Sequence, residues 1–320
     1  MRILITDNTH PVLQERFVEA GYECDVVAQC SYDSLLAMMP EYDGLVVRSK
    51  IVIDRSFIDN MGSRCRVIGR VGAGMETIDV AYAESKGIAC INSPEGNRDA
   101  VGEHATALLL ALFDKITIAN AEVRQGLWQR EANRGLEIKG KTVGIIGFGN
   151  MGAAFAQRLM GFECKVVAYD KYLPEHTMEN FRRLSYVEQV SLEELQRRAD
   201  VLSLHVPLTD DTHYMVCSDF IGAFNHPFYL INTARGAVVK TPDLVQGMQE
   251  GKILGAALDV IEYENMSKDG LDLASLPADF RYLLQSNRTV LTPHVGGWTV
   301  ESKYKLAYFL AEKMIAAFNA

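Results

Sequence analysis

Residues 141–152 read KTVGIIGFGNMG, a stretch in which an apolar run is followed by closely spaced glycines. The apolar run at residues 142–146 is typical of a buried strand. Gly147, Gly149 and Gly152 follow with the spacing G-x-G-x-x-G, and the next residues, AAFAQRLMGF, have a helical pattern. A strand, a glycine turn and a helix in this order predict the first half of a βαβ unit.

Each glycine has a physical reason to be there. Gly147 permits the tight turn, Gly149 lets the backbone approach a pyrophosphate, and Gly152 allows close packing of helix and strand. The amides of Asn150 and Met151 open the helix and would face phosphate groups. The stretch therefore predicts a dinucleotide site.

The next strand, KVVAY, ends at Asp170, which lies 170 − 152 = 18 residues after Gly152. An acid at this spacing accepts hydrogen bonds from the adenosine ribose. It also repels a 2′-phosphate, so NAD is favoured over NADP, although Lys171 weakens that preference. A glycine turn that serves another nucleotide, such as S-adenosylmethionine, is the alternative interpretation.

The whole chain has 320 residues, a length that favours two domains. Its net charge of −9 argues against general nucleic-acid binding, which needs a basic face. Six scattered cysteines form no CxxC pair and no zinc-ligand pattern, so no metal is expected. The start MRILIT has no leader pattern, and we expect a cytoplasmic protein.

Short apolar runs alternate with helical stretches nearly throughout, which predicts parallel sheets covered by helices. We expect an α/β protein with two Rossmann-like, doubly wound domains and a cleft between them. Residues 1–98 and 290–320 would form a discontinuous substrate domain, because the helical tail 301–320 would pack back on it. Residues 99–289 would form the NAD-binding domain, starting with one long helical pattern over 99–125 and followed by an extended arm around Trp128.

Three polar residues follow successive strands of the second series. Arg235 comes after FYLIN, Asp259 is the penultimate residue of GAALDV, and His294 follows TVLTP. Ligands of open parallel sheets bind beyond the carboxyl ends of the strands, so these residues are site candidates. Taken singly, Arg235 could be a surface charge and His294 a structural histidine.

Six motifs together are specific for one family: VGAGMETIDV, GKTVGIIGFGNMG, LHVPLTDDT, INTARG, GAALDVIEYEN and LTPHVGG. The chain resembles the NAD-dependent, D-isomer-specific 2-hydroxyacid dehydrogenases over nearly its whole length. Glu76 and Thr77 stand where the family more often has Asp-Asn. Asn265 replaces a usual proline, and the stretch from Glu264 to His294 looks longer than usual.

The resemblance implies the catalytic roles. Arg235 matches the arginine that grips the substrate carboxylate and orients the keto oxygen. His294 matches the acid/base, and Glu264 matches its carboxylate partner, which should raise the pKa of the imidazole. In reduction His294 would give a proton to the keto oxygen, and in oxidation it would take the hydroxyl proton.

The resemblance also implies a set of cofactor-binding residues beyond the glycine loop. Asp259 matches the residue that binds the nicotinamide carboxamide. The other matching positions lie after three strands: His205, Pro207, Thr212, Thr233, Ala234, Gly296 and Gly297.

A substrate site is expected in the first domain. Arg48 and Lys50 flank Ser49 at a strand end and, being two apart, would share a face. The stretch Val71, Gly72, Ala73 and Gly74 resembles the family loop whose amides hold the substrate carboxylate. The two cations, with Arg130 as a further candidate, would take a phosphate, unless they are ordinary surface charges.

This layout favours 3-phosphoglycerate and 3-phosphohydroxypyruvate, as in the short phosphoglycerate dehydrogenases of serine biosynthesis. Serine feedback through a C-terminal sensing domain is not expected. The alternatives are a broad glyoxylate/hydroxypyruvate reductase, an erythronate 4-phosphate dehydrogenase and a non-catalytic NAD-sensing module. The family resemblance also implies a homodimer formed through the helix from Val101 and the arm around Trp128.

Overall fold

The structure is a computed structural model that describes residues 1–264 and 276–319. The chain divides into two compact units: Met1–Arg98 together with Trp298–Ala320, and Asp99–Gly297. Each unit contains a parallel sheet with helices on both faces. The prediction of an α/β protein with two parallel sheets and a discontinuous first domain is confirmed.

The sheet of the first unit has the order β2-β1-β3-β4-β5. Its strands are short apolar runs: β1 Arg2–Thr6, β2 Glu23–Val27, β3 Gly44–Val47, β4 Val67–Arg70 and β5 Ala89–Asn92. The helices are α1 Val12–Glu19, α2 Tyr32–Met38, α3 Arg55–Asn60, α4 Val80–Ser85 and α13 Val300–Asn319. Serine or aspartate side chains cap the amino ends of α2, α3 and α4, which explains where these helices begin.

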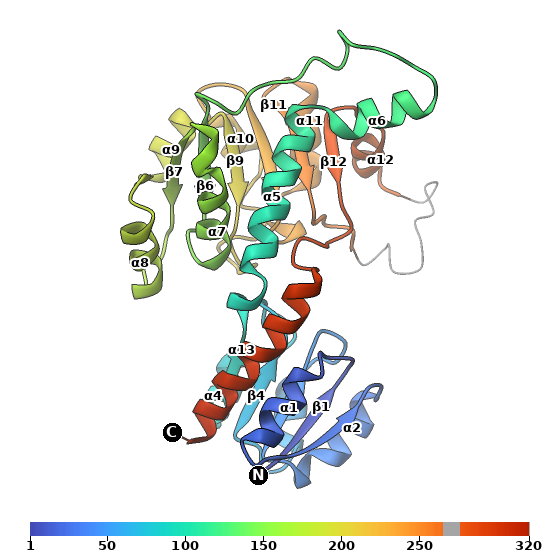
Figure 1. Cartoon of the computed structure of the whole chain (residues 1–320), viewed down its shortest axis with the longest axis vertical. Helices are drawn as coiled ribbons and strands as arrows, with labels where there is room; N and C mark the ends of the chain where they lie inside the picture. The colour runs from blue at the N-terminus through green and yellow to red at the C-terminus, as the bar shows by residue number, and fades with distance from the viewer. Residues whose placement is uncertain (265–275, 320) are drawn as a thin grey trace. The chain divides into compact units, whose positions relative to one another are not determined.

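Two apolar layers hold this unit together. Helices α2, α3 and α4 pack on one face of the sheet, and α1 and α13 pack on the other. Helix α13 comes so close that a Cβ on Gly69 would lie 2.3 Å from the sulfur of Met314. The glycine in β4 thus makes room for the C-terminal helix, which Figure 1 shows in red beside β4 and α1.

The sheet of the second unit has the order β12-β11-β10-β9-β6-β7-β8. Its strands are β6 Thr142–Ile146, β7 Lys165–Tyr169, β8 Val187–Gln189, β9 Val201–Leu204, β10 Phe228–Asn232, β11 Ile253–Leu258 and β12 Thr289–Leu291. Its helices are α5 Arg98–Phe113, α6 Ile116–Arg124, α7 Asn150–Leu159, α8 Glu175–Arg183, α9 Leu192–Arg198, α10 Ser218–Gly222, α11 Thr241–Gln249 and α12 Ala278–Gln285.

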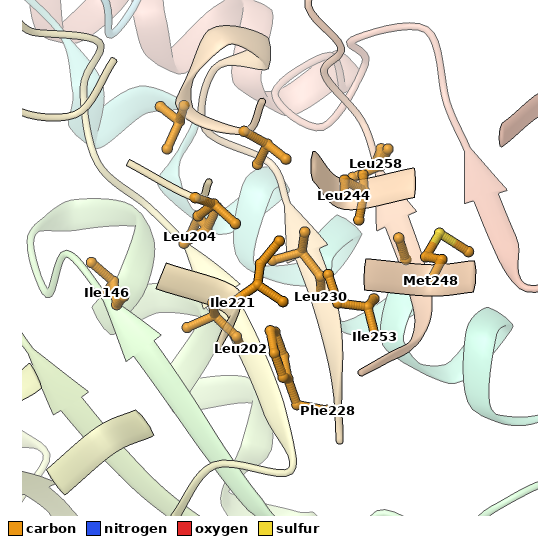
Figure 2. Packing of buried hydrophobic residues seen from close by; sticks show 14 of the residues in the cluster. Ile146, Leu202, Leu204, Ile221, Phe228, Leu230, Leu244, Met248, Ile253 and Leu258 are labelled. Atoms are coloured by element: carbon orange, nitrogen blue, oxygen red, sulfur yellow. The ribbon is translucent and has the colours of Figure 1, made fainter. Parts of the chain in front are cut away.

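Helices cover both faces of this sheet. Side chains of α5 and α7 pack on one face, and side chains of α9 to α12 pack on the other. Figure 2 shows part of the second layer, where Phe228 and Leu230 of β10 meet Ile221 of α10 and Met248 of α11. Each such fully buried side chain contributes about 1.5–3 kcal/mol, so this layer fixes the strands that carry the site.

Two boundaries differ from the sequence prediction. The predicted single helix over 99–125 is broken, because Lys115 has a left-handed backbone (φ 52°) between α5 and α6. The returning arm stabilises the break: the Leu136 amide donates to the Phe113 carbonyl at 3.1 Å. The predicted domain boundary after residue 289 falls inside β12, which pairs with β11, so the second unit runs on to Gly297.

In the described part of the chain, no helix combines the length and apolar character needed to span a bilayer.

Candidate active site

The candidate catalytic residues follow three neighbouring strands of the second unit. Strands β10, β11 and β12 lie side by side in the sheet, and Arg235, Asp259 and His294 come directly after them. Because parallel strands end at the same edge, the three residues gather there. The structure thus brings them together as the sequence pattern predicts, while their roles stay predictions.

Arg235 is positioned by a tight turn after β10. The buried Asn232 side chain accepts from the Ala234 amide and donates to the Arg235 carbonyl, both at 3.0 Å. The next residue, Gly236, lies so close to the 261–264 segment that a Cβ would be 2.1 Å from the Ile261 carbonyl oxygen. This contact fixes the arginine loop against the segment that carries Glu264.

His294 and Glu264 form the pair that the resemblance implies. The Nδ1 atom of His294 lies 2.9 Å from Oε2 of Glu264. The Ile261 amide donates to the other Glu264 oxygen at 3.2 Å, which holds the carboxylate in place. The hydrogen bond to Glu264 raises the pKa of His294 above 6.5, against the opposing effect of burial. With Nδ1 engaged, Nε2 is the atom that can exchange a proton with a substrate.

A Glu264→Gln variant should shift the pH profile. The variant lacks the carboxylate that raises the pKa of His294, so that pKa falls. Keto-acid reduction needs the imidazolium, and its rate should therefore decline at lower pH than in the wild type. Hydroxy-acid oxidation needs neutral imidazole and should begin at lower pH. Profiles of kcat/KM in both directions test this, and an unchanged midpoint in both would contradict it.

Asp259 holds the backbone on which His294 sits. Its carboxylate, only 2% exposed, accepts from the Val295 amide at 2.9 Å and the Gly296 amide at 2.8 Å. Its carbonyl accepts from the His294 amide at 2.8 Å, and His294 has a left-handed backbone with φ 55°. The carboxylate thus stabilises an uncommon loop conformation.

Two residues that sequence reasoning missed complete this network. The Thr292 hydroxyl donates to Asp259 at 2.6 Å and accepts from Nε2 of His104 at 3.0 Å, and that nitrogen is 3.3 Å from Asp259. Burial alone would raise the pKa of Asp259, but these donors lower it to about 2. Such a saturated carboxylate is better placed to position His294 than to meet a cofactor; the predicted carboxamide contact stays a prediction.

The glycine loop between β6 and α7 has the shape that a dinucleotide needs. Gly147 has φ 87°, and a Cβ on it would lie 2.5 Å from the His205 carbonyl oxygen. A Cβ on Gly152 would lie 2.0 Å from the Gly147 carbonyl oxygen. Above Gly149, in contrast, the nearest atom to such a Cβ would be 3.9 Å away, on His176. The open space at the helix start, where Asn150 and Met151 begin α7, lets a pyrophosphate approach the backbone.

Two predicted cofactor residues have buried polar atoms that make no hydrogen bond within the described chain, namely Nδ1 of His205 and Oγ1 of Thr233. Burial lowers the pKa of His205 to about 3, so the ring is neutral. Asp170 accepts from the Phe148 amide of the glycine loop at 2.7 Å. The two buried atoms without a hydrogen-bond partner among the described residues, and the carboxylate of Asp170 beside the glycine loop, are suited to bind a dinucleotide.

The remaining predicted cofactor-binding residues lie in the segments that follow β9, β10 and β12. The Thr212 hydroxyl donates to the Pro207 carbonyl at 2.6 Å, so it closes its own loop. Ala234 is buried beside Arg235, and Gly296 packs against Asp259, followed by Gly297. Asn265 lies outside the described residues.

Arg48 and Lys50, the two predicted phosphate-binding residues of the first unit, have different surroundings. Strand β3 ends at Val47, so the expected alternation does not extend to Lys50. The ammonium of Lys50 pairs with the buried carboxylate of Asp7 at 2.9 Å. Arg48 instead donates to the Asn8 carbonyl at 3.2 Å and lies 5.9 Å from the ring of Trp298. Ser49 between them is exposed.

The loop at residues 71–74 follows β4, the sheet neighbour of β3. Gly72 has φ 151°, and a Cβ there would lie 1.8 Å from the guanidinium of Arg70. The Asn92 side chain donates to the Ala73 carbonyl at 2.5 Å. Arg70, which ends β4, is a cation beside this loop that sequence reasoning missed.

A glycine loop shaped for a dinucleotide and a histidine–glutamate pair at the same edge of one sheet are features that a nicotinamide-dependent oxidoreductase requires. The family model for the D-isomer specific 2-hydroxyacid dehydrogenase NAD binding domain matches residues 106–296. The chain therefore belongs to the D-isomer specific 2-hydroxyacid dehydrogenases, and its cofactor is NAD.

Individual relatives agree with this. A hydroxypyruvate reductase of Thermotoga maritima is 36% identical, over 88% of this chain and 87% of its own length. A D-3-phosphoglycerate dehydrogenase of Methanocaldococcus jannaschii is 33% identical over 98% of this chain, which spans only 57% of that relative. A D-lactate dehydrogenase of Aquifex aeolicus, solved with NAD and lactic acid, superposes with a TM-score of 0.79 at 26% identity, covering 99% of this chain and 94% of that chain.

Proposed function

We propose that the protein oxidises D-3-phosphoglycerate to 3-phosphohydroxypyruvate, reversibly and with NAD, as a step of serine biosynthesis. The observation that carries the proposal is Arg48. Among the described residues no carboxylate forms an ion pair with this guanidinium, which is half-buried at the end of β3. A cation in that state suits a phosphate, which accepts charge-assisted hydrogen bonds.

The residues of the second unit supply the chemistry. Arg235 binds the carboxylate and polarises the keto oxygen of the substrate. His294, charged and held by Glu264, gives its Nε2 proton to that oxygen in reduction, and neutral His294 takes the hydroxyl proton in oxidation. The nicotinamide cofactor supplies or accepts the hydride. Asp259 keeps the His294 loop in place throughout.

A second candidate function is the reduction of hydroxypyruvate or glyoxylate. Two observations favour it. The relative from Thermotoga maritima carries the name hydroxypyruvate reductase and matches this chain over most of both lengths. The ion pair between Lys50 and Asp7 also removes one of the two cations that a phosphate would use.

Arg48→Ala separates the two functions. The variant should lower kcat/KM for 3-phosphohydroxypyruvate by about 10- to 100-fold, because a hydrogen bond to a charged group is lost. With hydroxypyruvate, the variant should have the same kcat/KM as the wild type. Arg55→Ala is the matched control, since Arg55 is an exposed arginine of the same unit that pairs with Asp79. Equal losses for both substrates would reject the phosphate role of Arg48.

A homodimer is part of the proposal. Helix α6 has no buried residue, and the segment around it exposes Ile116, Val123, Leu127 and Trp128, the last to 78%. Several exposed large apolar side chains in one short segment are a feature that interfaces often have. The mass of the protein in solution tests the assembly, and a monomer at micromolar concentration would contradict it.

A further inference from the structure

Asp211 ties together two loops that flank the glycine loop. Strand β6, from which the glycine loop starts, lies between β7 and β9 in the sheet. Lys171 and Tyr172 follow β7, and Asp211 lies in the segment after β9. One oxygen of Asp211 lies 2.6 Å from the Lys171 ammonium and accepts from the Tyr172 hydroxyl at 2.8 Å. These contacts therefore connect the segments after β7 and β9, the two strands on either side of β6.

This cluster adjoins the residue that distinguishes the two nicotinamide cofactors. Asp170 accepts from the amides of Phe148 and Tyr172, so its carboxylate is held between the glycine loop and the Lys171 segment. In a dinucleotide fold the acid at this position meets the ribose hydroxyls, where NADP carries an additional phosphate. A nearby cation is what accommodates that phosphate.

Lys171 is the cation next to Asp170, and its ammonium group forms an ion pair with Asp211. The three side chains Asp170, Lys171 and Asp211 carry a net charge of −1. If the carboxylate of Asp211 were absent, the net charge would be zero and the ammonium could turn to a 2′-phosphate. Both members of the pair are 53% exposed, so the pair can be separated and its effect should depend on salt.

We propose that Asp211 is a cofactor-specificity residue: by pairing with Lys171 it withholds that cation from the 2′-phosphate of NADP(H) and strengthens the preference for NAD(H) set by Asp170. This role of Asp211 concerns the cofactor alone and does not depend on which substrate the protein uses.

The test measures dissociation constants of NADH and NADPH by the fluorescence of the bound nicotinamide, without any substrate. Asp211→Asn keeps an acceptor for the Tyr172 hydroxyl but removes the charge. We expect NADPH to bind about two- to fivefold more tightly relative to NADH than in the wild type, in proportion to the weak energy of an exposed pair. The gain should shrink at high salt.

Two further variants make the result specific. Asp210→Asn removes the same charge one residue away and should leave the ratio of the two constants unchanged. The double variant Lys171→Gln/Asp211→Asn should lose the gain, because the released cation is gone. An unchanged ratio in Asp211→Asn, an equal gain in Asp210→Asn, or a gain that persists in the double variant would each overturn the proposal.

Discussion

Replacement of His294 by alanine should reduce kcat for keto-acid reduction by about 10²–10⁴-fold, the usual contribution of a positioned general acid. The hydrogen bond to Glu264 raises the pKa of the imidazole, which favours the protonated form that a proton donor needs. NADH should bind as in the wild type, because the glycine loop that would hold its phosphates lies between β6 and α7, whereas His294 follows β12. Turnover and NADH binding, measured on the same preparation, check both halves of this expectation.

His226→Ala is the matched control. This histidine also faces a carboxylate, Asp200 at 3.5 Å, but precedes β10 and so lies at the opposite end of the strand from Arg235. The His226→Ala variant should therefore retain the turnover of the wild type. A His294→Ala variant that keeps full activity would show that another group transfers the proton. A variant that loses NADH binding as well would show that the histidine has a structural role.

Asp259→Asn should destabilise the protein and slow turnover together. The carboxylate accepts from two backbone amides and the Thr292 hydroxyl, with His104 3.3 Å away. Whichever way the asparagine amide is turned, its NH₂ group faces a backbone N–H, and two donors then oppose each other. We expect a loss of about 2–4 kcal/mol in the free energy of unfolding, and a lower kcat because the His294 loop relaxes.

The pH dependence of this effect has a definite sign. The folded-state pKa of Asp259 is about 2, below the ordinary value of 3.8. The stability that the carboxylate contributes is therefore complete above 3.8 and is lost as pH falls toward 2. Denaturant unfolding of the wild type and the variant between neutral pH and pH 2 should converge at the acidic end. Thr292→Ser, which keeps the hydroxyl, is the control, and a constant difference over the whole range would contradict this account.

Much of the fold was predictable because it depends on local patterns. The glycine spacing before α7, the apolar strand runs and the strand-end positions of Arg235, Asp259 and His294 are visible within a few residues each. The break at Lys115 was missed because it depends on the arm returning to the end of α5, and not on the helical pattern itself.

The supporting contacts of the site could not be predicted, since they join residues far apart in sequence. His104 and Thr292 are separated by 188 residues, and Lys171 and Asp211 by 40. The pairing of Lys50 with Asp7 was missed for the same reason: nothing in the sequence places the end of β1 beside the end of β3. The residue types indicated the chemistry of the site. Which charged side chains form ion pairs, in contrast, depends on the order of the strands in the sheet.

The decisive experiment is the reduction of NAD by the purified wild-type protein with D-3-phosphoglycerate, compared with D-glycerate, D-lactate and the L isomers at matched concentrations. We expect turnover for D isomers alone and the highest kcat/KM for the phosphorylated acid. A higher kcat/KM for D-glycerate than for D-3-phosphoglycerate would contradict the proposed substrate, and no turnover with any D-2-hydroxy acid would contradict the assigned chemistry of His294.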